Sequence, residues 1–330
     1  MGKMDQEIIR FSVIMPLYNK GAYVEKAIHS VLEQTYPHYE LIVVNDGSKD
    51  NSAEIAEKLL DGVSNARLIN QENAGVAVAR NNGVAQAKGE YVCFLDADDW
   101  WEPMYLEQMA KFIRDYPDAG LYGMNYIYYK PGKTRVALKS KTGYINYPKE
   151  YLQNNAMMIF TSSSSSMPKS VFEAIGGFPV GIKLGEDFLL WTKIALHYKV
   201  AFCETALAYY NNDVPATMRA TRNLHAPECH MLFKMQYLES VVENENSALK
   251  NKADWKQLLD KLRVNGLLEF WMSDQYHNIA KQELTKVDWS KQSAKVCKIY
   301  KTPIWLLRAK QGFMRVGSFV KQSLIRLFVK

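Results

Sequence analysis

The sequence predicts an α/β fold: a parallel sheet covered by helices, followed by a helical extension. Apolar strand patterns and amphipathic helix patterns alternate through the first hundred residues. This alternation is typical of parallel sheets, because each crossover between parallel strands needs a connecting segment that is usually a helix. Polar loops follow the strands, and after about residue 222 the strand patterns fade into helical periodicity.

The elements of the sheet follow in order from hydrophobic periodicity. Residues 11–17 read FSVIMPL, an apolar run that ends in a polar turn, and residues 23–34 carry apolar side chains at helical spacing. Gly89 follows the third helical pattern and ends it. We therefore expect strands at 11–17, 41–44, 67–70 and 91–95, and helices at 23–34, 52–60 and 75–88.

The rest of the chain divides into a mixed region and a helical region. Tyrosine-rich strand patterns, a serine run at 162–166 and a Gly-Gly-Phe-Pro loop at 176–179 lie between residues 122 and 200. From residue 232 onward leucines and other apolar residues recur at helical spacing. We expect one domain over residues 1–222 and a helical extension over residues 223–330.

Composition excludes several protein classes. The chain has 330 residues, of which 48% are hydrophobic and 23% charged, so it can form a sizeable core. Its four cysteines are far apart and form no CxxC pair, which argues against a disulfide framework or a zinc ribbon. The charged N-terminus does not resemble a signal peptide, and no apolar run reaches spanning length. We expect a cytoplasmic protein.

Positive charge gathers at the C-terminus. Residues 281–330 hold twelve Lys or Arg and two acids, whereas the whole chain has a net charge of +6. Apolar residues from Phe313 to Phe328 form a stripe flanked by bases, so this helix could lie peripherally on an anionic membrane surface or pack on its own domain. No nucleic-acid-binding module accompanies the charge, and we expect no nucleic-acid partner.

Polar residues follow three of the expected strands. Tyr18, Asp46 and the acidic turn at 96–99 each come directly after a strand, so they should meet at one edge of the sheet. In the turn, Asp96 and Asp98 are spaced so that one carboxylate could reach a ribose and the other a hard divalent cation that bridges phosphates. An isolated Asp-x-Asp pair is weak evidence, because acidic turns also cap helices.

Four sequence blocks strengthen this interpretation. The chain reads VIMPLYNK at 13–20, ELIVVNDGSKDNS at 40–52, NAGVAVARNNGVAQAKGEYVCFLDADD at 73–99 and GGFPVGIKLGEDFLLW at 176–191. In this order and spacing the blocks resemble the family 2 inverting glycosyltransferases of the GT-A fold, over about residues 11–215. The resemblance implies a Rossmann-like mixed sheet flanked by helices, and a structural role for the serine run.

The resemblance implies a nucleotide-binding side of the site. Pro16 and Tyr18 match positions that contact the nucleobase, and Asp46 matches the acid that reads the base imide or the nearby ribose. The family usually has two consecutive acids at the place of residues 45 and 46, whereas this chain has Asn45 followed by Asp46. Asn73 and Arg80 match the next nucleotide-side positions. Taken without the resemblance, Arg80 could equally be an exposed helix residue that pairs with an acid.

The resemblance also implies the catalytic side. Asp96 would hold the ribose, Asp98 would bind Mn²⁺ or Mg²⁺, and Asp99 would support or replace it as a ligand. Asp187 matches the catalytic base, although a carboxylate there could also cap a helix. Basic residues of a mobile loop near 211–225, among them Arg219, Arg222 and His225, could add positive charge near the diphosphate.

The function implied is metal-dependent, inverting transfer of a sugar from a nucleotide sugar, most simply a UDP-sugar, to a glycan or lipid-linked glycan in bacterial surface-polysaccharide synthesis. Two alternatives stay open from the sequence. A nucleotidyltransferase shares the metal-binding acids but needs a Gly- and Lys/Arg-rich phosphate loop, which residues 17–20 do not provide. A catalytically silent nucleotide-sugar-binding subunit would keep the pocket without turnover.

Overall fold

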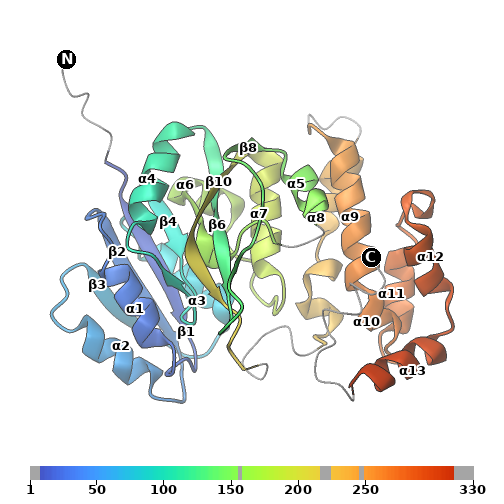
Figure 1. Cartoon of the computed structure of the whole chain (residues 1–330), viewed down its shortest axis with the longest axis horizontal. Coiled ribbons are helices and arrows are strands. Elements are labelled where there is room, and N and C mark those ends of the chain that lie inside the picture. The colour runs from blue at the N-terminus through green and yellow to red at the C-terminus, as the bar shows by residue number, and fades with distance from the viewer. Residues whose placement is uncertain (1–7, 155–157, 216–223, 245–248, 316–330) are drawn as a thin grey trace. The chain divides into compact units, whose positions relative to one another are not determined.

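The computed structural model describes residues 8–154, 158–215, 224–244 and 249–315, with side chains to residue 309. The chain forms two compact units, one of residues 1–222 with 228–231 and one of residues 223–227 with 232–330. Figure 1 colours the chain from its N-terminus to its C-terminus.

A mixed sheet forms the centre of the first unit. Along the sheet the strand order is β3-β2-β1-β4-β9-β6-β10-β5, with β7 paired to β6 and β8 to β10. The strands are β1 Phe11–Leu17, β2 Tyr39–Asp46, β3 Ala66–Gln71, β4 Tyr91–Phe94, β5 Trp100–Trp101, β6 Ala119–Tyr129, β7 Arg135–Val136, β8 Gly143–Ile145, β9 Ser165–Pro168 and β10 Lys199–Asn211. The first four are parallel, β9 runs antiparallel to both β4 and β6, and β6 is parallel to β10.

Helices flank this sheet, as Figure 1 shows. They are α1 Val24–Leu32, α2 Ser52–Leu60, α3 Val76–Ala85, α4 Tyr105–Asp115, α5 Tyr147–Gln153, α6 Lys169–Ile175 and α7 Glu186–His197. Every residue of β1 is buried, because helices cover both faces of the strand. On one face Val13 and Met15 join a core that includes α1 and α4. On the other face Gly83 of α3 lies so close to Ile14 and Val44 that a larger residue would clash.

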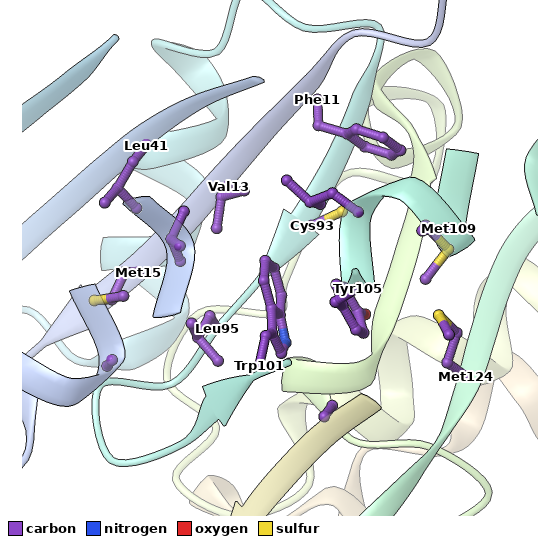
Figure 2. Packing of buried hydrophobic residues seen from close by; sticks show 14 of the residues in the cluster. Phe11, Val13, Met15, Leu41, Cys93, Leu95, Trp101, Tyr105, Met109 and Met124 are labelled. Carbon is purple, nitrogen blue, oxygen red and sulfur yellow. The ribbon is translucent and has the colours of Figure 1, made fainter. Parts of the chain in front are cut away.

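Aromatic and sulfur-containing side chains fill the core between β1, β4 and α4 (Figure 2). The rings of Trp101 and Tyr105 stack with centroids 4.0 Å apart. Trp101 also donates a hydrogen bond from Nε1 to the backbone oxygen of Ser163, 2.6 Å away. Because Trp101 comes two residues after the acidic turn, this packing holds the end of the turn against the core.

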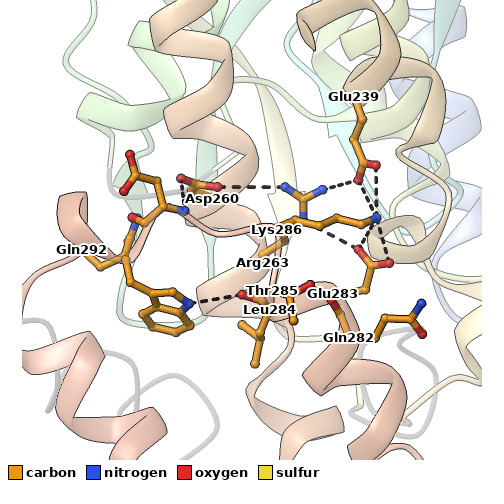
Figure 3. Close-up of polar contacts among 11 residues, drawn as sticks. Glu239, Asp260, Arg263, Gln282, Glu283, Leu284, Thr285, Lys286 and Gln292 are labelled. Atoms are coloured by element: carbon orange, nitrogen blue, oxygen red, sulfur yellow. Dashed lines mark hydrogen bonds and ion pairs between the residues drawn. The ribbon is translucent and has the colours of Figure 1, made fainter.

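The second unit is helical in the residues that the structure describes. Its α-helices are α8 Gln236–Glu243, α9 Lys252–Gly266, α10 Leu268–Trp271, α11 His277–Leu284, α12 Ala294–Lys301 and α13 Ile304–Arg315. Arg263 of α9 is buried and pairs with Glu239 of α8, with Asp260 of its own helix and with Glu283 of α11 (Figure 3). This ion network ties three helices together.

The expected fold class is confirmed: a Rossmann-like mixed sheet flanked by helices, followed by a helical region. The predicted strand at 11–17 matches β1 and the predicted helix at 52–60 matches α2, whereas the other early elements differ by a few residues at their ends. Among the described helices, none is both long and apolar enough to cross a membrane. The side chains of the basic stripe expected at 313–328 lie outside the described residues.

Candidate active site

The nucleotide side of the candidate site begins at the carboxyl ends of β1 and β2, which lie at one sheet edge because the strands are parallel. Pro16 is buried within β1, whereas Tyr18 just beyond the strand is 44% exposed. An exposed aromatic ring at this edge can stack on a planar nucleobase. The structure therefore leaves Tyr18 free for the contact that the sequence predicts.

The loop after β1 is tied to the loop after β2. Asn19 has a left-handed backbone with a φ of 50°, which asparagine tolerates better than most residues. The side-chain oxygen Oδ1 of Asn19 accepts a hydrogen bond from the backbone N–H of Lys49 at 2.7 Å. The backbone N–H of Asn19 donates a hydrogen bond to Ser48 Oγ. The N–H of Lys20 donates to Ser52 Oγ at 2.8 Å. These bonds fix the direction in which the Lys20 side chain leaves the loop.

Asp46, at the end of β2, holds the loop after β3. Its Oδ1 accepts hydrogen bonds from Gln71 Nε2 and the Ala74 N–H, both at 2.8 Å. Its Oδ2 accepts from the Gly75 N–H at 2.9 Å and from Asn73 Nδ2 at 3.2 Å. These four bonds use the acceptor capacity of one carboxylate. Asp46 thus shapes the segment that carries Asn73, and its direct contact with a nucleobase stays a prediction.

The acidic turn after β4, residues 96–99, is held in place by hydrogen bonds to the serine run at 162–166. The N–H of Asp96 donates to Ser163 Oγ at 3.1 Å, and Ser163 Oγ donates to Asp99 Oδ2 at 2.5 Å. The other oxygen of Asp99 accepts from the N–H of Asn211 at 2.8 Å. Burial raises the pKa of Asp99, and the carboxylates of Asp98 and Asp96 raise it further. Asp99 is therefore an anchor of the turn, and the structural role expected for the serine run is confirmed.

Asp98 pairs with a lysine in this structure. Lys20 Nζ lies 2.5 Å from Asp98 Oδ2, and the two side chains are 18% and 19% exposed. Burial raises the pKa of Asp98 and the Asp96 carboxylate adds to this rise, while the Lys20 ammonium opposes it. A cationic group thus stands beside the carboxylate that the sequence predicts to bind a divalent cation.

Arg80 joins the acidic turn to the first residue of α7. It is only 3% exposed, which contradicts the alternative of an exposed helix residue. One guanidinium nitrogen lies 2.7 Å from Asp96 Oδ1 and another lies 2.9 Å from Glu186 Oε1. The guanidinium carbon also lies 4.9 Å from the ring centroid of Phe178. A planar fork suits this bridging between two carboxylates.

Asp187 is the second residue of α7, whose cap position is Gly185 with a φ of 87°. Its Oδ1 accepts a hydrogen bond from the N–H of Phe188 at 2.7 Å. Burial and the neighbouring Glu186 carboxylate raise the pKa of Asp187 to about 7, against the lowering effect of Arg80. A carboxyl group with a pKa near neutrality in a buried setting is a candidate general base.

Tyr151 lies near Asp187, Tyr210 lies near the acidic turn, and Tyr128 lies near both tyrosines. The rings of Tyr128 and Tyr210 have centroids 5.5 Å apart. Burial raises the pKa of Tyr151, and the Asp187 carboxylate and the Tyr128 hydroxyl raise it further. Burial also raises the pKa of Tyr210, with added contributions from Asp99 and Tyr128. Tyr128 is therefore within electrostatic reach of residues on both sides of the site.

Sequence reasoning missed two parts of this arrangement. The block at 13–20 contains Lys20 but gives no sign of its role, and the tyrosine-rich strand patterns give no sign of their place at the site. Only the folded chain shows that Lys20 reaches Asp98 across 78 residues. Of the loop residues considered near the diphosphate, Arg219 and Arg222 lie outside the described residues.

Part of the sequence matches a known protein family. The family model described as Glycosyl transferase family 2 matches residues 12–176, half of the chain. The chain belongs to glycosyl transferase family 2. The matched residues contain Pro16, Tyr18, Asp46, Asn73, Arg80, Asp96 and Asp98, and end before Asp187.

Several bacterial glycosyltransferases are similar to part of this chain. Glycosyltransferase GlyA of Streptococcus pneumoniae is 43% identical over 107 residues, which cover 32% of this chain and 15% of GlyA. TuaG of Bacillus subtilis, a protein named for teichuronic acid biosynthesis, is 43% identical over 107 residues, 32% of this chain and 42% of TuaG. A Rickettsia felis glycosyltransferase is 30% identical over 71% of this chain and 39% of its own length. The chain thus spans less than half of each of these relatives.

Solved structures share the fold. S. aureus TarS 1–349 in complex with UDP-GlcNAc matches with a TM-score of 0.68 and 23% identity, covering 84% of this chain and 82% of that chain. A mannosyltransferase from Pyrobaculum calidifontis, in complex with GDP-Man and Mn²⁺, matches with a TM-score of 0.58 and 19% identity, covering 98% and 85%. At these identities the likeness supports the GT-A fold of family 2.

The residues present fit a divalent cation whose remaining ligands are supplied by the nucleotide and by water. Among the described residues, no three His, Cys, Asp or Glu side chains form a ready-made metal cluster. Mg²⁺ and Mn²⁺ nevertheless accept one or two carboxylates when water and phosphate oxygens supply the rest. Asp98 already attracts a cationic group, the Lys20 ammonium, and Asp99 is occupied by its own hydrogen bonds. Asp98 is therefore the fitting protein ligand.

Proposed function

We propose that this chain catalyses metal-dependent, inverting transfer of a sugar from a nucleotide sugar to a glycan or lipid-linked glycan acceptor. The donor that we propose is a UDP-sugar. One observation carries the proposal. Arg80 bridges Asp96 and Glu186, and so brings the acidic turn together with the residue that precedes Asp187. The family membership and the nucleotide-sugar complexes of the structural neighbours support it.

Asp187 acts as the general base in this proposal. It removes the proton from an acceptor hydroxyl, whose oxygen forms a bond to the anomeric carbon of the donor. The bond between that carbon and the diphosphate oxygen breaks on the opposite face, and the diphosphate leaves with the electron pair. A single displacement inverts the anomeric configuration. One base is enough, because no covalent sugar–enzyme bond has to be hydrolysed.

The nucleotide side holds the donor. Tyr18 stacks on the base, Pro16 shapes the floor beneath it, and Asp46 holds Asn73 in place. Asp96, oriented by Arg80, accepts hydrogen bonds from the ribose. A cation held by Asp98 would supply Lewis-acid neutralisation of the leaving diphosphate. Tyr128, Tyr151 and Tyr210 line the side where the acceptor enters, and their rings help to exclude water, which would waste the donor.

The setting proposed is bacterial surface-polysaccharide synthesis at the cytoplasmic face of the membrane, and TuaG, a relative named for teichuronic acid biosynthesis, supports it. In this setting the basic C-terminal residues would contact anionic lipid, each base near the surface contributing about 1 kcal/mol. Flotation of the intact chain with anionic vesicles checks this. Equal flotation of a Lys321→Gln/Arg326→Gln/Lys330→Gln variant would remove the tail from the proposal.

The function is tested by a donor screen with Mn²⁺ on the intact chain and three variants. Thermal shift reports donor binding, and release of nucleotide diphosphate reports turnover. Asp98→Ala should weaken cation-dependent donor binding, whereas Asp187→Asn should keep donor binding and lose turnover by at least about 100-fold. Asp61→Asn, an exposed acid after α2, is the matched control.

Each outcome separates the proposal from its alternatives. Binding with no turnover across many acceptors would indicate a nucleotide-sugar-binding subunit. Failure of every nucleotide sugar to bind to a folded chain, or turnover in Asp187→Asn equal to that of the control, would overturn the proposal.

A further inference from the structure

A basic turn joins β6 to β7 at the edge of the sheet that holds the candidate site. We define this basic turn by Lys130, Lys133 and Arg135, which are all exposed. No Asp or Glu occurs between residues 119 and 149. A block of like charge without intervening acids repels itself, so it is typical of a surface that meets an anionic partner.

The turn has a defined conformation that presents these charges together. The N–H of Lys133 donates a hydrogen bond to the backbone oxygen of Lys130 at 2.8 Å, and Gly132 between them has a φ of 71°. Pro131 followed by such a glycine is typical of a tight type II turn. The next residues pair with the end of β6, with Arg135 opposite Tyr128. The three cations are thus carried by one hairpin with a defined turn.

The basic turn lies at the site edge. β6 is parallel to β10 and antiparallel to β9, which is itself antiparallel to β4. The carboxyl end of β6 therefore points the same way as that of β4, where the acidic turn begins. The Arg135 guanidinium carbon lies 4.4 Å from the ring centroid of Tyr128. The Tyr128 hydroxyl in turn raises the pKa of Tyr151, which lies near Asp187.

In the described residues, the charges of the basic turn are not balanced by carboxylates. Over the part of the chain that the structure describes, Lys130, Lys133 and Arg135 form no ion pair with a carboxylate. Lys141, which follows the basic turn in the sequence, does pair with Glu204 at 3.0 Å. The lack of an ion pair is therefore a feature of the basic turn and not of every base in this stretch. A guanidinium on the Tyr128 ring, with two lysines on the same turn and no carboxylate paired to any of the three in the described residues, favours a ligand that brings its own negative charge.

We propose that the basic turn binds phosphate groups of the acceptor, so that this chain glycosylates a phosphate-bearing glycan. The inference rests on the proposed function, because it places the acceptor next to Tyr128 and Asp187. A guanidinium can bind a phosphate with two hydrogen bonds, and the lysines add point charges. The phosphate can come from phosphodiesters within a polymer or from the pyrophosphate of a lipid-linked glycan.

The test compares the intact chain with Lys130→Gln/Lys133→Gln/Arg135→Gln. The matched control is Lys139→Gln/Lys141→Gln/Lys149→Gln, which removes the same charge where the segment pairs with the start of β10 and enters α5. Two probes distinguish the phosphate sources: a soluble fluorescent polyphosphate chain, and a long-chain isoprenoid pyrophosphate carried in neutral phosphatidylcholine vesicles. Arg135→Gln alone provides a milder variant.

We expect the basic-turn variant to bind at least one probe about tenfold more weakly or worse, the control to bind nearly as the intact chain does, and the loss to shrink as salt rises. Loss with polyphosphate indicates a polymer acceptor, and loss with the lipid alone indicates a lipid-linked one. Equal binding of both probes by the two triple variants overturns the inference. Vesicles of anionic lipid without pyrophosphate are measured alongside the two probes, and a loss confined to these vesicles also overturns the inference, because it would indicate a membrane contact.

Binding of a UDP-sugar with Mn²⁺ is measured on the same samples. It should be unchanged in both triple variants, which also shows that they are folded. Absence of donor binding in the intact chain would contradict the proposed function, whereas intact donor binding with no effect of the basic turn would contradict the further inference alone.

Discussion

At the scale of single residues, the site depends on how a few buried charges are balanced. Arg80 compensates Asp96 and Glu186, and its charge also lowers the pKa of Asp187. Burial and Glu186 nevertheless raise that pKa to about 7. A carboxylate that is costly to ionise in the folded chain reduces stability, as is common where a protein keeps a residue for chemistry.

Asp187→Asn should therefore stabilise the chain in a pH-dependent way. The pKa of Asp187 is raised from about 4 in the unfolded chain to about 7 in the folded chain, so between these values the folded chain binds more protons. Stability from this group is present below about pH 4 and is lost as the pH rises to 7. Melting temperatures of intact chain and variant should be similar at pH 4.5, and the variant should melt several degrees higher at pH 8.

The same melting experiment has a clear contrary result. If the difference between Asp187→Asn and the intact chain were equal at both pH values, Asp187 would not titrate near neutrality. The exposed Asp61→Asn substitution, measured in parallel, controls for a general effect of removing one negative charge.

Lys20 and a divalent cation should compete for Asp98. Without Lys20 the carboxylate has no ammonium at 2.5 Å, so a cation meets less repulsion. Lys20→Met should bind Mn²⁺ about tenfold more tightly than the intact chain when no nucleotide is present, as measured by electron paramagnetic resonance of free Mn²⁺. Lys20→Arg, which keeps the charge, should not. Unchanged affinity in Lys20→Met would show that Mn²⁺ binds elsewhere.

At the scale of elements, loops and helices are held by side chains that come from elsewhere in the chain. Asp46 fixes the loop after β3, Ser163 fixes the acidic turn, and Arg263 fixes three helices of the second unit. In that last network Lys286 also pairs with Glu239 and Glu283 (Figure 3). The acids outnumber the bases, so each base is needed.

Arg263→Met should destabilise the second unit strongly. The substitution leaves Glu239, Asp260 and Glu283 with less compensation in a buried setting, which typically costs about 3–5 kcal/mol. Arg308→Met is the matched control, because its pairing with Asp274 is exposed and should contribute less than about 1 kcal/mol. Urea unfolding followed by tryptophan fluorescence measures both. Equal destabilisation by the two substitutions would show that the network contributes little.

At the scale of the whole molecule, the fold could be predicted further than the site. β1 follows from its sequence because a strand buried on both faces is apolar throughout. β9 could not be predicted, since Ser165–Pro168 has no apolar pattern and becomes a strand only by pairing with β4 and β6. The helix expected to reach Lys88 ends at Ala85, because periodicity locates helix ends poorly.

The site shows the same division. Residues after parallel strands could be predicted to meet, because strand direction places their carboxyl ends at one edge. The contacts of Lys20 with Asp98 and of Arg80 with Glu186 could not, since they join residues 78 and 106 positions apart through tertiary packing. The roles of these residues in catalysis stay predictions.

The most direct test of the central claim is the anomeric configuration of the sugar that the intact chain releases. With Mn²⁺ and an α-linked UDP-sugar, slow transfer to water can be followed by proton NMR before the product equilibrates. The account predicts that the β-anomer appears first and that Asp187→Asn releases neither anomer above the background rate. First appearance of the α-anomer, or equal release by Asp187→Asn, would contradict inverting transfer with Asp187 as the base.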